Sequence, residues 1–338
     1  MNKIAIAIHG GAGTILKSEM TAELEKEYGS ALENALQAGW KIIRSGGNSL
    51  DAVEASVCEL ENNPLFNAGR GSVFTHDGKN EMDASIMDGN THLAGAVALI
   101  QNVKNPIKLA RLVMEKTEHF LLAGDGANKF AREMKIEFAP NEYFYSDLRY
   151  GQLIEAQKEN RVQLDHAEQG TRVKGQGSRD NPKSKIQNPK SKIQNPKSKI
   201  QNPIGTVGAV ACDSSGNLAA ATSTGGMTNK KFGRIGDTPI IGAGIYADND
   251  TCAVSCTGHG EFFMLAAAAY DVAARMKYKN SGLIEAAQET IEHLRLMGGE
   301  GGLIAVDNLG NLALPFNSEG MYRAFITSDS ETSIEIYR

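Results

Sequence analysis

Gly205 and Thr206 are the residues whose order most directly suggests chemistry, because a threonine after a glycine suits a chain that cuts itself between the two. Glycine permits backbone geometries closed to other residues, which a self-cleavage step can use. In that step the Thr206 hydroxyl attacks the Gly205 carbonyl, and hydrolysis of the resulting ester leaves Thr206 as a new N-terminus. An N-terminal threonine holds a nucleophile and its base in one residue, because its free amine can accept the proton of its own hydroxyl.

The same dipeptide has a simpler interpretation, in which Gly205 and Thr206 merely open a β-strand. Two short apolar runs joined by a polar turn follow it, in the stretch GTVGAVACDSSGNLAAATSTGG at 205–226. The dipeptide alone favours the strand, so the choice between the two interpretations depends on the rest of the chain. If the chain cuts itself, it is a hydrolase made as an inactive precursor.

Composition excludes several other classes of protein. The chain has 338 residues, of which 41% are apolar and 22% charged, which is ordinary for a globular protein with one large core. A net charge of −5 argues against nucleic acid as a partner. The first apolar run, in MNKIAIAIHGGAG, is too short for a signal peptide, and no run is long enough to span a bilayer. We therefore expect a cytoplasmic protein that acts on a small molecule, with no nucleic-acid or membrane partner.

The four cysteines are Cys58, Cys212, Cys252 and Cys256, and none of them forms a CxxC pair. The even spacing of Cys252 and Cys256 places both on one face of a strand. All four are interpreted as small buried hydrophobic residues in a reducing cytosol, with a disulfide or a metal role as the alternative.

The elements that must position Thr206 are predicted from periodicity and turn residues. A strand at 3–8 ends in a glycine-rich turn at 9–13, and Ser49 is the predicted cap of the second helix. Strands in the middle of the chain with helices before and after indicate sheets packed face to face under helical layers. Helices are expected at 20–44, 49–62, 106–117, 125–134, 261–277 and 282–296, and further strands at 81–88, 93–100, 206–212, 218–224, 240–246, 252–257, 302–307 and 311–314.

Residues 181–201 are three perfect copies of NPKSKIQ. The period is seven, but each copy has one apolar residue and one proline, so neither a coiled-coil seam nor a continuous helix can form. Together with the polar residues before them, the copies predict a flexible, lysine-rich linker over 161–204. A basic docking arm is the alternative.

Seven motifs in order carry a resemblance to a known family. With them the chain resembles the plant-type L-asparaginase / isoaspartyl peptidase family, which are N-terminal-nucleophile hydrolases of the threonine type. The resemblance covers all but the 161–204 linker and the C-terminal tail. The motifs are HGGAG at 9–13, GNSLDAVEASV at 47–57, NPLFNAGRGSVFT at 63–75, EMDASIMDG at 81–89, GTVGAVACD at 205–213, ATSTGGMTNKKFGRIGD at 221–237 and CTGHGE at 256–261.

The resemblance implies a fold and a maturation path. The fold is α+β, a four-layer αββα sandwich with antiparallel sheets between helical layers, built by residues 1–338 as one domain. Cleavage between Gly205 and Thr206 gives an alpha subunit, 1–205, which carries the linker, and a beta subunit, 206–338. Two such processed units associate as a heterotetramer. The implied activity is hydrolysis of β-aspartyl (isoaspartyl) dipeptides and L-asparagine, which releases aspartate.

The resemblance also implies roles for single residues. Thr206 matches the nucleophile, Thr224 a second threonine that hydrogen-bonds near it, and Asn67 a polar residue that faces it. Thr257 and Gly258 match an oxyanion hole made of a hydroxyl and a backbone N–H, which suits a developing anion.

Three further positions match a substrate site. Arg234 and Asp237 match the pair that binds the α-carboxylate and the α-ammonium, which suits a planar guanidinium fork and a carboxylate. Gly260 matches a carbonyl that contacts the ammonium. By themselves, Arg234 and Asp237 are also typical of a surface ion pair. His259 is interpreted as a pocket rim or helix start and not as a base.

No cofactor for catalysis is implied, but a structural sodium ion is. In the family, main-chain carbonyls of one loop wrap that ion, and oxygen ligands suit a hard cation. A tight loop without metal is the alternative. The matching carbonyls belong to Leu60, Glu61, Asn63, Phe66, Ala68 and Arg70.

Other enzyme classes do not fit the motifs. The glycines at 11–13 lack the third glycine of a dinucleotide-binding turn, and the chain has no GxSxG, HExxH or spaced Cys/His set. Two alternatives stay open. One is a glycosylasparaginase-like amidohydrolase, and the other is an unprocessed, non-catalytic amino-acid-binding protein on the same scaffold.

Overall fold

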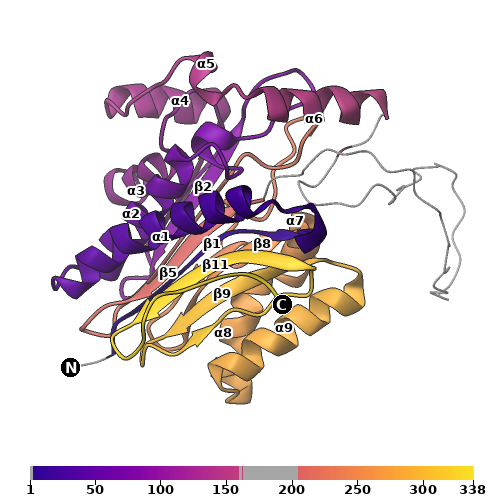
Figure 1. The fold of residues 1–338 in the computed structure, drawn as a ribbon. Helices are drawn as coiled ribbons and strands as arrows, with labels where there is room; N and C mark the ends of the chain where they lie inside the picture. Colours follow the sequence, from indigo (N-terminus) through magenta and orange to yellow (C-terminus); the bar gives the residue numbers. More distant parts are fainter. Residues whose placement is uncertain (1–2, 160–161, 163–204) are drawn as a thin grey trace, which may run out of the picture.

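The computed structural model describes residues 3–159, 162 and 205–338. The predicted linker and its NPKSKIQ copies lie outside the described residues, apart from Val162. Helices lie on the outer sides of two mostly antiparallel sheets, which agrees with the α+β class (Figure 1). Before Thr206 the elements are β1 (Ala5–Gly13), α1 (Ala22–Arg44), α2 (Ser49–Asn62), β2 (Met82–Asp88), β3 (Ala94–Ile100), α3 (Pro106–Lys116), β4 (Leu121–Ala123), α4 (Gly124–Glu133), α5 (Asn141–Phe144) and α6 (Asp147–Lys158), with 3-10 turns at Lys17–Glu19 and Gly69–Gly71. After Thr206 they are β5 (Val207–Cys212), β6 (Leu218–Thr224), β7 (Ile245–Ala247), β8 (Cys252–Gly258), α7 (Gly260–Ala266), α8 (Ala268–Lys279), α9 (Leu283–Met297), β9 (Gly301–Asp307), β10 (Leu312–Ala313), β11 (Gly320–Thr327) and β12 (Ser333–Tyr337).

The described strands form two sheets. The larger has the order β12-β11-β1-β5-β6-β2-β3-β4, and the smaller has the order β10-β9-β8-β7. Every pair is antiparallel except β3 with β4, which is parallel. The prediction of purely antiparallel sheets is therefore wrong at this edge, where α3 connects the two strands as a crossover.

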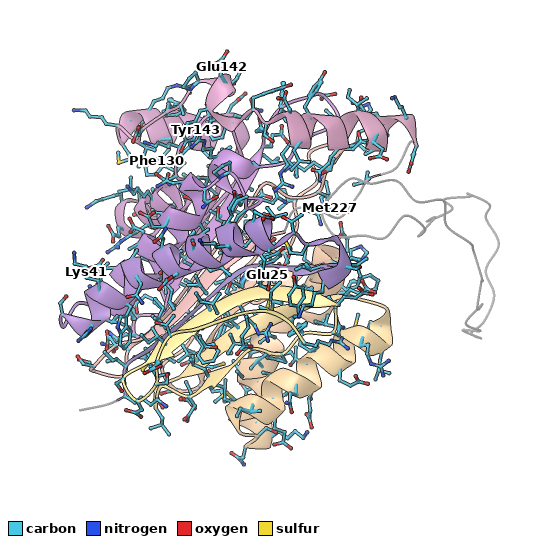
Figure 2. All side chains as sticks on the ribbon, viewed as in Figure 1. Glu25, Lys41, Phe130, Glu142, Tyr143 and Met227 are labelled. Carbon is cyan, nitrogen blue, oxygen red and sulfur yellow. The ribbon has the colours of Figure 1, made fainter. Side chains whose placement is uncertain are left out.

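Three hydrophobic clusters hold the elements together, and alternation along the strands sorts the residues between them. In β1, Ile6 and Ile8 face helices α1–α3, whereas Ala5 and Ala7 face the smaller sheet. A separate cluster joins the smaller sheet to α8 and α9. The cluster between the sheets combines alanines with larger side chains such as Ile245, Ile304 and Met321. Exposed side chains such as Lys41 and Glu142 cover the outside (Figure 2).

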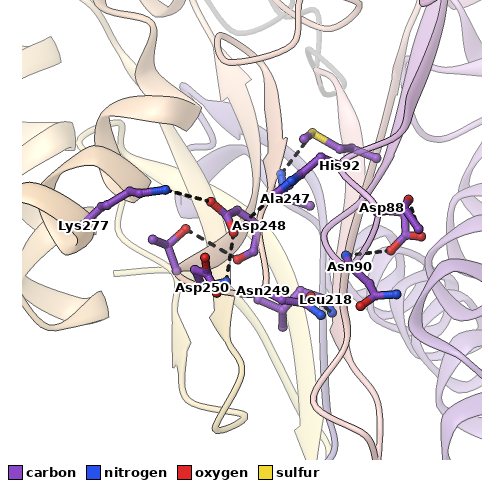
Figure 3. A network of polar contacts seen from close by, with 12 residues as sticks. Asp88, Asn90, His92, Leu218, Ala247, Asp248, Asn249, Asp250 and Lys277 are labelled. Carbon is purple, nitrogen blue, oxygen red and sulfur yellow. Dashed lines mark hydrogen bonds and ion pairs between the residues drawn. The ribbon is translucent and has the colours of Figure 1, made fainter.

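A polar network joins the two sheets at one end (Figure 3). Asp248, which is buried, lies 3.1 Å from His92 Nε2 and 3.8 Å from Lys277 Nζ. The next residue, Asn249, accepts a bond from Leu218 N at 2.9 Å and donates its own N–H to the Gly89 carbonyl. The network therefore ties the hairpin between β2 and β3 to the turn between β7 and β8.

Several predicted elements need correction. The residues 9–13 are not a turn, because β1 runs through them with an irregularity between His9 and Gly11. The cap of α2 is Asn48, whose side chain accepts from Asp51 N, and not Ser49. The strand expected at 240–246 is shorter and begins later, because β7 covers only Ile245–Ala247. The helix expected at 261–277 is broken at Ala267, which has a φ of 47°, into α7 and α8. The short elements β4 and α5 and the twelve-residue helix α6 were not predicted.

The prediction also ended the strands too early, because β11 and β12 follow. Strand β11 pairs with β1 from Ala5 to Gly13 and lies between it and β12. Tyr322 in β11 is buried against Tyr28 of α1, with ring centroids 4.6 Å apart. Arg323 donates to the Tyr337 carbonyl and pairs with Glu335 in β12.

We expect two truncations to differ sharply. A chain that stops after Asp329 loses the edge strand β12 and should fold with a lower melting temperature. A chain that stops after Asn317 also loses β11, which exposes one whole edge of β1 and removes Tyr322 from the core, so it should show no cooperative melting. Thermal unfolding followed by circular dichroism makes the comparison. Wild-type melting in the shorter chain would contradict the role given to β11.

Candidate active site

Thr206 lies directly before β5 and is buried. Its hydroxyl donates a hydrogen bond of 3.2 Å to the hydroxyl oxygen of Thr224, the last residue of β6. The register pairs Val207 with Ser223, so the neighbouring residues Thr206 and Thr224 lie side by side. Thr224 also accepts a bond of 3.0 Å from Gly226 N.

Asn67 lies in the loop after α2 and holds the turn that follows Thr224. Its side-chain amide donates to the Gly226 carbonyl at 2.8 Å, its side-chain oxygen accepts from Val73 N at 3.0 Å, and its own carbonyl accepts from Gly225 N. A Cβ on Gly225 would lie 2.5 Å from Asn67 Oδ1, so glycine is needed there. Asn67 therefore reaches the threonine pair through this turn.

Thr257 and Gly258 end β8. Thr257 is fully buried, and its hydroxyl oxygen accepts a bond of 3.3 Å from Ala12 N in β1. Gly258 has a φ of 145°, and a Cβ there would collide with the Glu300 carbonyl. Because residue 258 must be glycine, it carries no side chain that would cover the main chain next to the buried Thr257. Helix α7, which begins two residues later at Gly260, has seven residues.

Arg234, Asp237 and Gly260 are brought together. A Cβ built on Gly260 would lie 2.7 Å from Asp237 Oδ1 and 3.0 Å from Arg234 Nη2. Arg234 donates through Nε and Nη2 to the two carboxylate oxygens of Glu261, each at 2.9 Å. The sequence motifs did not single out Glu261 for this ion pair. Burial works to raise the pKa of Glu261, but Arg234 outweighs it and the pKa is lowered.

The carboxylate of Asp237 has one buried oxygen, Oδ2, without a hydrogen-bond partner within the described part of the chain. Burial raises the pKa of Asp237 to about 6, against the opposing charge of Arg234. An unpaired buried carboxylate is costly, so a cation bound here would gain a strong interaction.

His9 is the functional candidate that the motifs contained but that received no role. It is fully buried, and its Nδ1 lies 3.0 Å from the Thr206 carbonyl oxygen, while Nε2 lies 2.8 Å from Ser255 Oγ. The contact joins residues almost 200 positions apart, so no local pattern reveals it. The position of His9 in HGGAG was the available signal.

A buried lysine lies close to the same turn. Lys230 Nζ donates to the Glu81 carbonyl at 2.8 Å, and a Cβ on Gly226 would lie 3.1 Å from it. Burial lowers the pKa of Lys230, and the nearby Asp83 opposes that shift. Its signal in the sequence was the pair of lysines at 230–231, inside the motif at 221–237.

The loop predicted to bind sodium is tightly packed, and main-chain carbonyls lie close to its glycines Gly69 and Gly71. A Cβ on Gly71 would collide with the Phe66 carbonyl and lie 2.6 Å from that of Pro64, and one on Gly69 would collide with the Glu61 carbonyl. Carbonyl oxygens crowded around two glycines are the donors that a hard monovalent cation accepts. Four of the six predicted carbonyls, those of Leu60, Asn63, Phe66 and Ala68, accept hydrogen bonds from main-chain N–H groups within the loop.

Other metal and disulfide chemistry is not supported by the described residues. Within them, no group of three or more His, Cys, Asp or Glu side chains is placed to hold a metal ion. All four cysteines are free and buried, as predicted, and Cys252 and Cys256 share the cluster under α8 and α9. No helix in the described ranges has the length and apolar character that crossing a bilayer requires.

A profile of the asparaginase family matches residues 2–336, almost the whole chain. The chain belongs to the asparaginase family. The isoaspartyl peptidase of Escherichia coli (strain K12) is 48% identical to it, over 100% of this chain and 97% of that protein. The isoaspartyl peptidase/L-asparaginase of Xenopus laevis is 40% identical, over 99% and 96%. A relative in Arabidopsis thaliana is 45% identical over 98% of each chain. The resemblance based on seven motifs is confirmed.

We expect Asp237→Asn to stabilise the protein at neutral pH. Burial raises the folded pKa of Asp237 to about 6, above the unfolded value, so the folded state loses stability as the pH rises from the unfolded carboxyl pKa to about 6, and the loss is complete above that pH. The Asn variant should gain on the order of 2 kcal/mol at about pH 8 and almost nothing at about pH 3, where both states are protonated. Melting temperatures at both pH values test this, with the exposed Asp77→Asn as the control. Destabilisation at pH 8 would contradict the account.

Proposed function

We propose that this protein is an isoaspartyl peptidase and L-asparaginase that matures by cutting itself before Thr206. The observation that carries the proposal is the bond between the hydroxyls of Thr206 and Thr224, in a chain nearly half identical to an isoaspartyl peptidase over its whole length. Its substrates are β-aspartyl dipeptides and asparagine, and it releases aspartate from both.

Maturation uses the Thr206 hydroxyl. The oxygen attacks the Gly205 carbonyl, its proton passes to the departing Thr206 nitrogen, and the Gly205 acyl group moves onto Oγ1 as an ester. Water then hydrolyses the ester, which frees the Gly205 carboxylate and regenerates the hydroxyl. The bond to Thr224 orients the hydroxyl for this attack. The products are fragments of 205 and 133 residues.

Turnover uses the same hydroxyl with a new base. The free amine of Thr206 accepts the hydroxyl proton while Oγ1 attacks the side-chain carbonyl of the substrate. The Thr257 hydroxyl and the Gly258 N–H donate to the developing oxyanion. The amine then protonates the leaving group, which is ammonia from asparagine or an amino acid from a dipeptide. Water hydrolyses the aspartyl ester and aspartate departs.

The substrate's backbone groups are bound by the cluster around Gly260. The Asp237 carboxylate, with its unpartnered oxygen, receives the α-ammonium together with the Gly260 carbonyl. Arg234 binds the α-carboxylate. Glu261 occupies Nε and Nη2 of Arg234, so in this proposal Nη1 is the nitrogen that donates to the α-carboxylate. Binding one residue by both charges restricts the reaction to aspartyl groups with free backbone termini.

The proposal extends to the assembly. We assign residues 1–205 and 206–338 to the alpha and beta subunits of one domain, an αββα sandwich supported by the three hydrophobic clusters. We also propose that two processed units pair as a heterotetramer, that a sodium ion sits in the loop at 60–70 without entering the chemistry, and that the protein is cytoplasmic. Light scattering of the processed enzyme measures the assembly.

We expect Thr206→Ala to leave one uncut chain without amidase activity, because a single hydroxyl serves both maturation and turnover. Thr206→Ser should still be cut, more slowly, because a hydroxyl remains. A denaturing gel separates two fragments from one band, and release of aspartate from β-Asp-Leu and from asparagine gives the activity. An Ala variant that is cut and active would contradict the proposal. An uncut wild type that binds asparagine without hydrolysis would favour the non-catalytic alternative.

We expect Thr257→Val and Arg234→Ala to separate chemistry from binding. Valine keeps the shape of Thr257 and removes the hydroxyl, so kcat should fall on the order of 10²–10³-fold with KM little changed. Arg234→Ala should mainly raise KM. Steady-state kinetics on β-Asp-Leu measures both constants. The same pattern in both variants would show that the two roles are misassigned.

A further inference from the structure

The imidazole of His9 lies at one end of a chain of three side chains that runs from β1 in the larger sheet to Ser255 in the smaller sheet and back to Thr222 in the larger sheet. Its Nδ1 contacts the Thr206 carbonyl at 3.0 Å, and its Nε2 contacts Ser255 Oγ in β8 at 2.8 Å. Ser255 Oγ lies 2.8 Å from Thr222 Oγ1 in β6. All of these residues are buried. Of the HGGAG motif, the proposed function uses only Ala12, through its bond to Thr257, so His9 has no role in it.

The direction of every bond in this chain follows from the Thr206 carbonyl, which can only accept. Burial lowers the pKa of His9 to about 3, against the hydrogen bond to Thr206, so the ring is neutral and carries one N–H. That proton is therefore on Nδ1, and Nε2 accepts from the Ser255 hydroxyl. Ser255 in turn accepts from Thr222. Each donor points towards the carbonyl of the nucleophile.

Gly208 makes room for this arrangement. The register places it opposite His9 in the pairing of β1 with β5. A Cβ on Gly208 would collide with Ser255 Oγ and lie 2.5 Å from His9 Nε2. The chain of bonds therefore depends on two residues, the histidine at position 9 in β1 and the glycine at position 208 in β5.

The Thr206 carbonyl has a particular need for an external donor. The pairing of β5 with its neighbours begins at Val207, so Thr206 lies beyond the ladder of main-chain bonds. Cleavage before Thr206 removes the chain on its other side as well. After maturation the residue is anchored through its carbonyl, its hydroxyl and the bond to Val207.

We propose that His9 is a positioning residue that holds the Thr206 carbonyl and thereby directs the nucleophile's amine and hydroxyl. With the carbonyl fixed, rotation of Thr206 about its Cα–C bond is restricted, which keeps the hydroxyl towards Thr224 and the substrate. Misplacement of a reacting group by about 1 Å costs on the order of 10²-fold in rate. This inference rests on the proposed function of Thr206.

The test compares His9→Ala with His9→Asn. An asparagine amide nitrogen lies about as far from the backbone as Nδ1, so Asn can still donate to the Thr206 carbonyl. We expect kcat of the cut enzyme to fall on the order of 10²-fold in the Ala variant, with KM within about two-fold, and Asn to recover about ten-fold. Equal losses in both variants at wild-type melting temperature, or no loss in Ala, would overturn the proposal.

Ser255→Ala tests the chain of bonds and decides the matter if His9→Ala fails to fold. It should lower kcat about ten-fold alone and have no further effect in the His9→Ala background, because Ser255 acts through His9. Wild-type kcat in the single variant, or additive loss in the double variant, would contradict the proposal. Ser56→Ala, which deletes another buried serine hydroxyl, is the control and should leave kcat unchanged. Wild-type enzyme in the same assay tests the proposed function separately.

Discussion

The site depends on one constraint, the register of β5 against β6. Because Val207 pairs with Ser223, Thr206 and Thr224 meet beyond the last paired residues, with their hydroxyls 3.2 Å apart. A shift of one residue would turn the side chains to the opposite face and separate the pair. Neighbours on both sides secure this register, since β1 pairs with β5 and β2 with β6.

The second requirement is a close approach of the two sheets. Alanines such as Ala5 and Ala7 face the smaller sheet, and Gly208 leaves space where His9 meets Ser255. Thr257 lies near the end of β8 in the smaller sheet, and its hydroxyl oxygen accepts a hydrogen bond from Ala12 N in β1 of the larger sheet. Thr206, the proposed nucleophile, and Thr257, the proposed oxyanion donor, are therefore positioned by strands of different sheets.

Much of this was predictable, for identifiable reasons. The proximity of Thr206 to Thr224 and of Arg234 to Asp237 was predicted because these residues lie in contiguous sequence motifs. The long helix α1 was predicted because its apolar residues recur at helical spacing. The role of His9 was not, because its partners are distant in sequence. The glycines after His9 suggested a turn, but pairing with β5 and β11 keeps them in a strand. Strand β11 was missed although Tyr322, Phe325 and Ile326, which are residue types favoured in strands, offered a signal. The sodium site and the catalytic roles remain predictions.

The most direct test of the account is to trap the acyl intermediate. The wild-type enzyme is mixed with asparagine, quenched in acid during turnover, and its fragments are weighed by mass spectrometry and mapped by peptide sequencing. The account predicts a fragment that begins at Thr206 and carries one aspartyl group as an ester on that residue. An aspartyl group on any other residue, or turnover by a chain that stays whole, would contradict it.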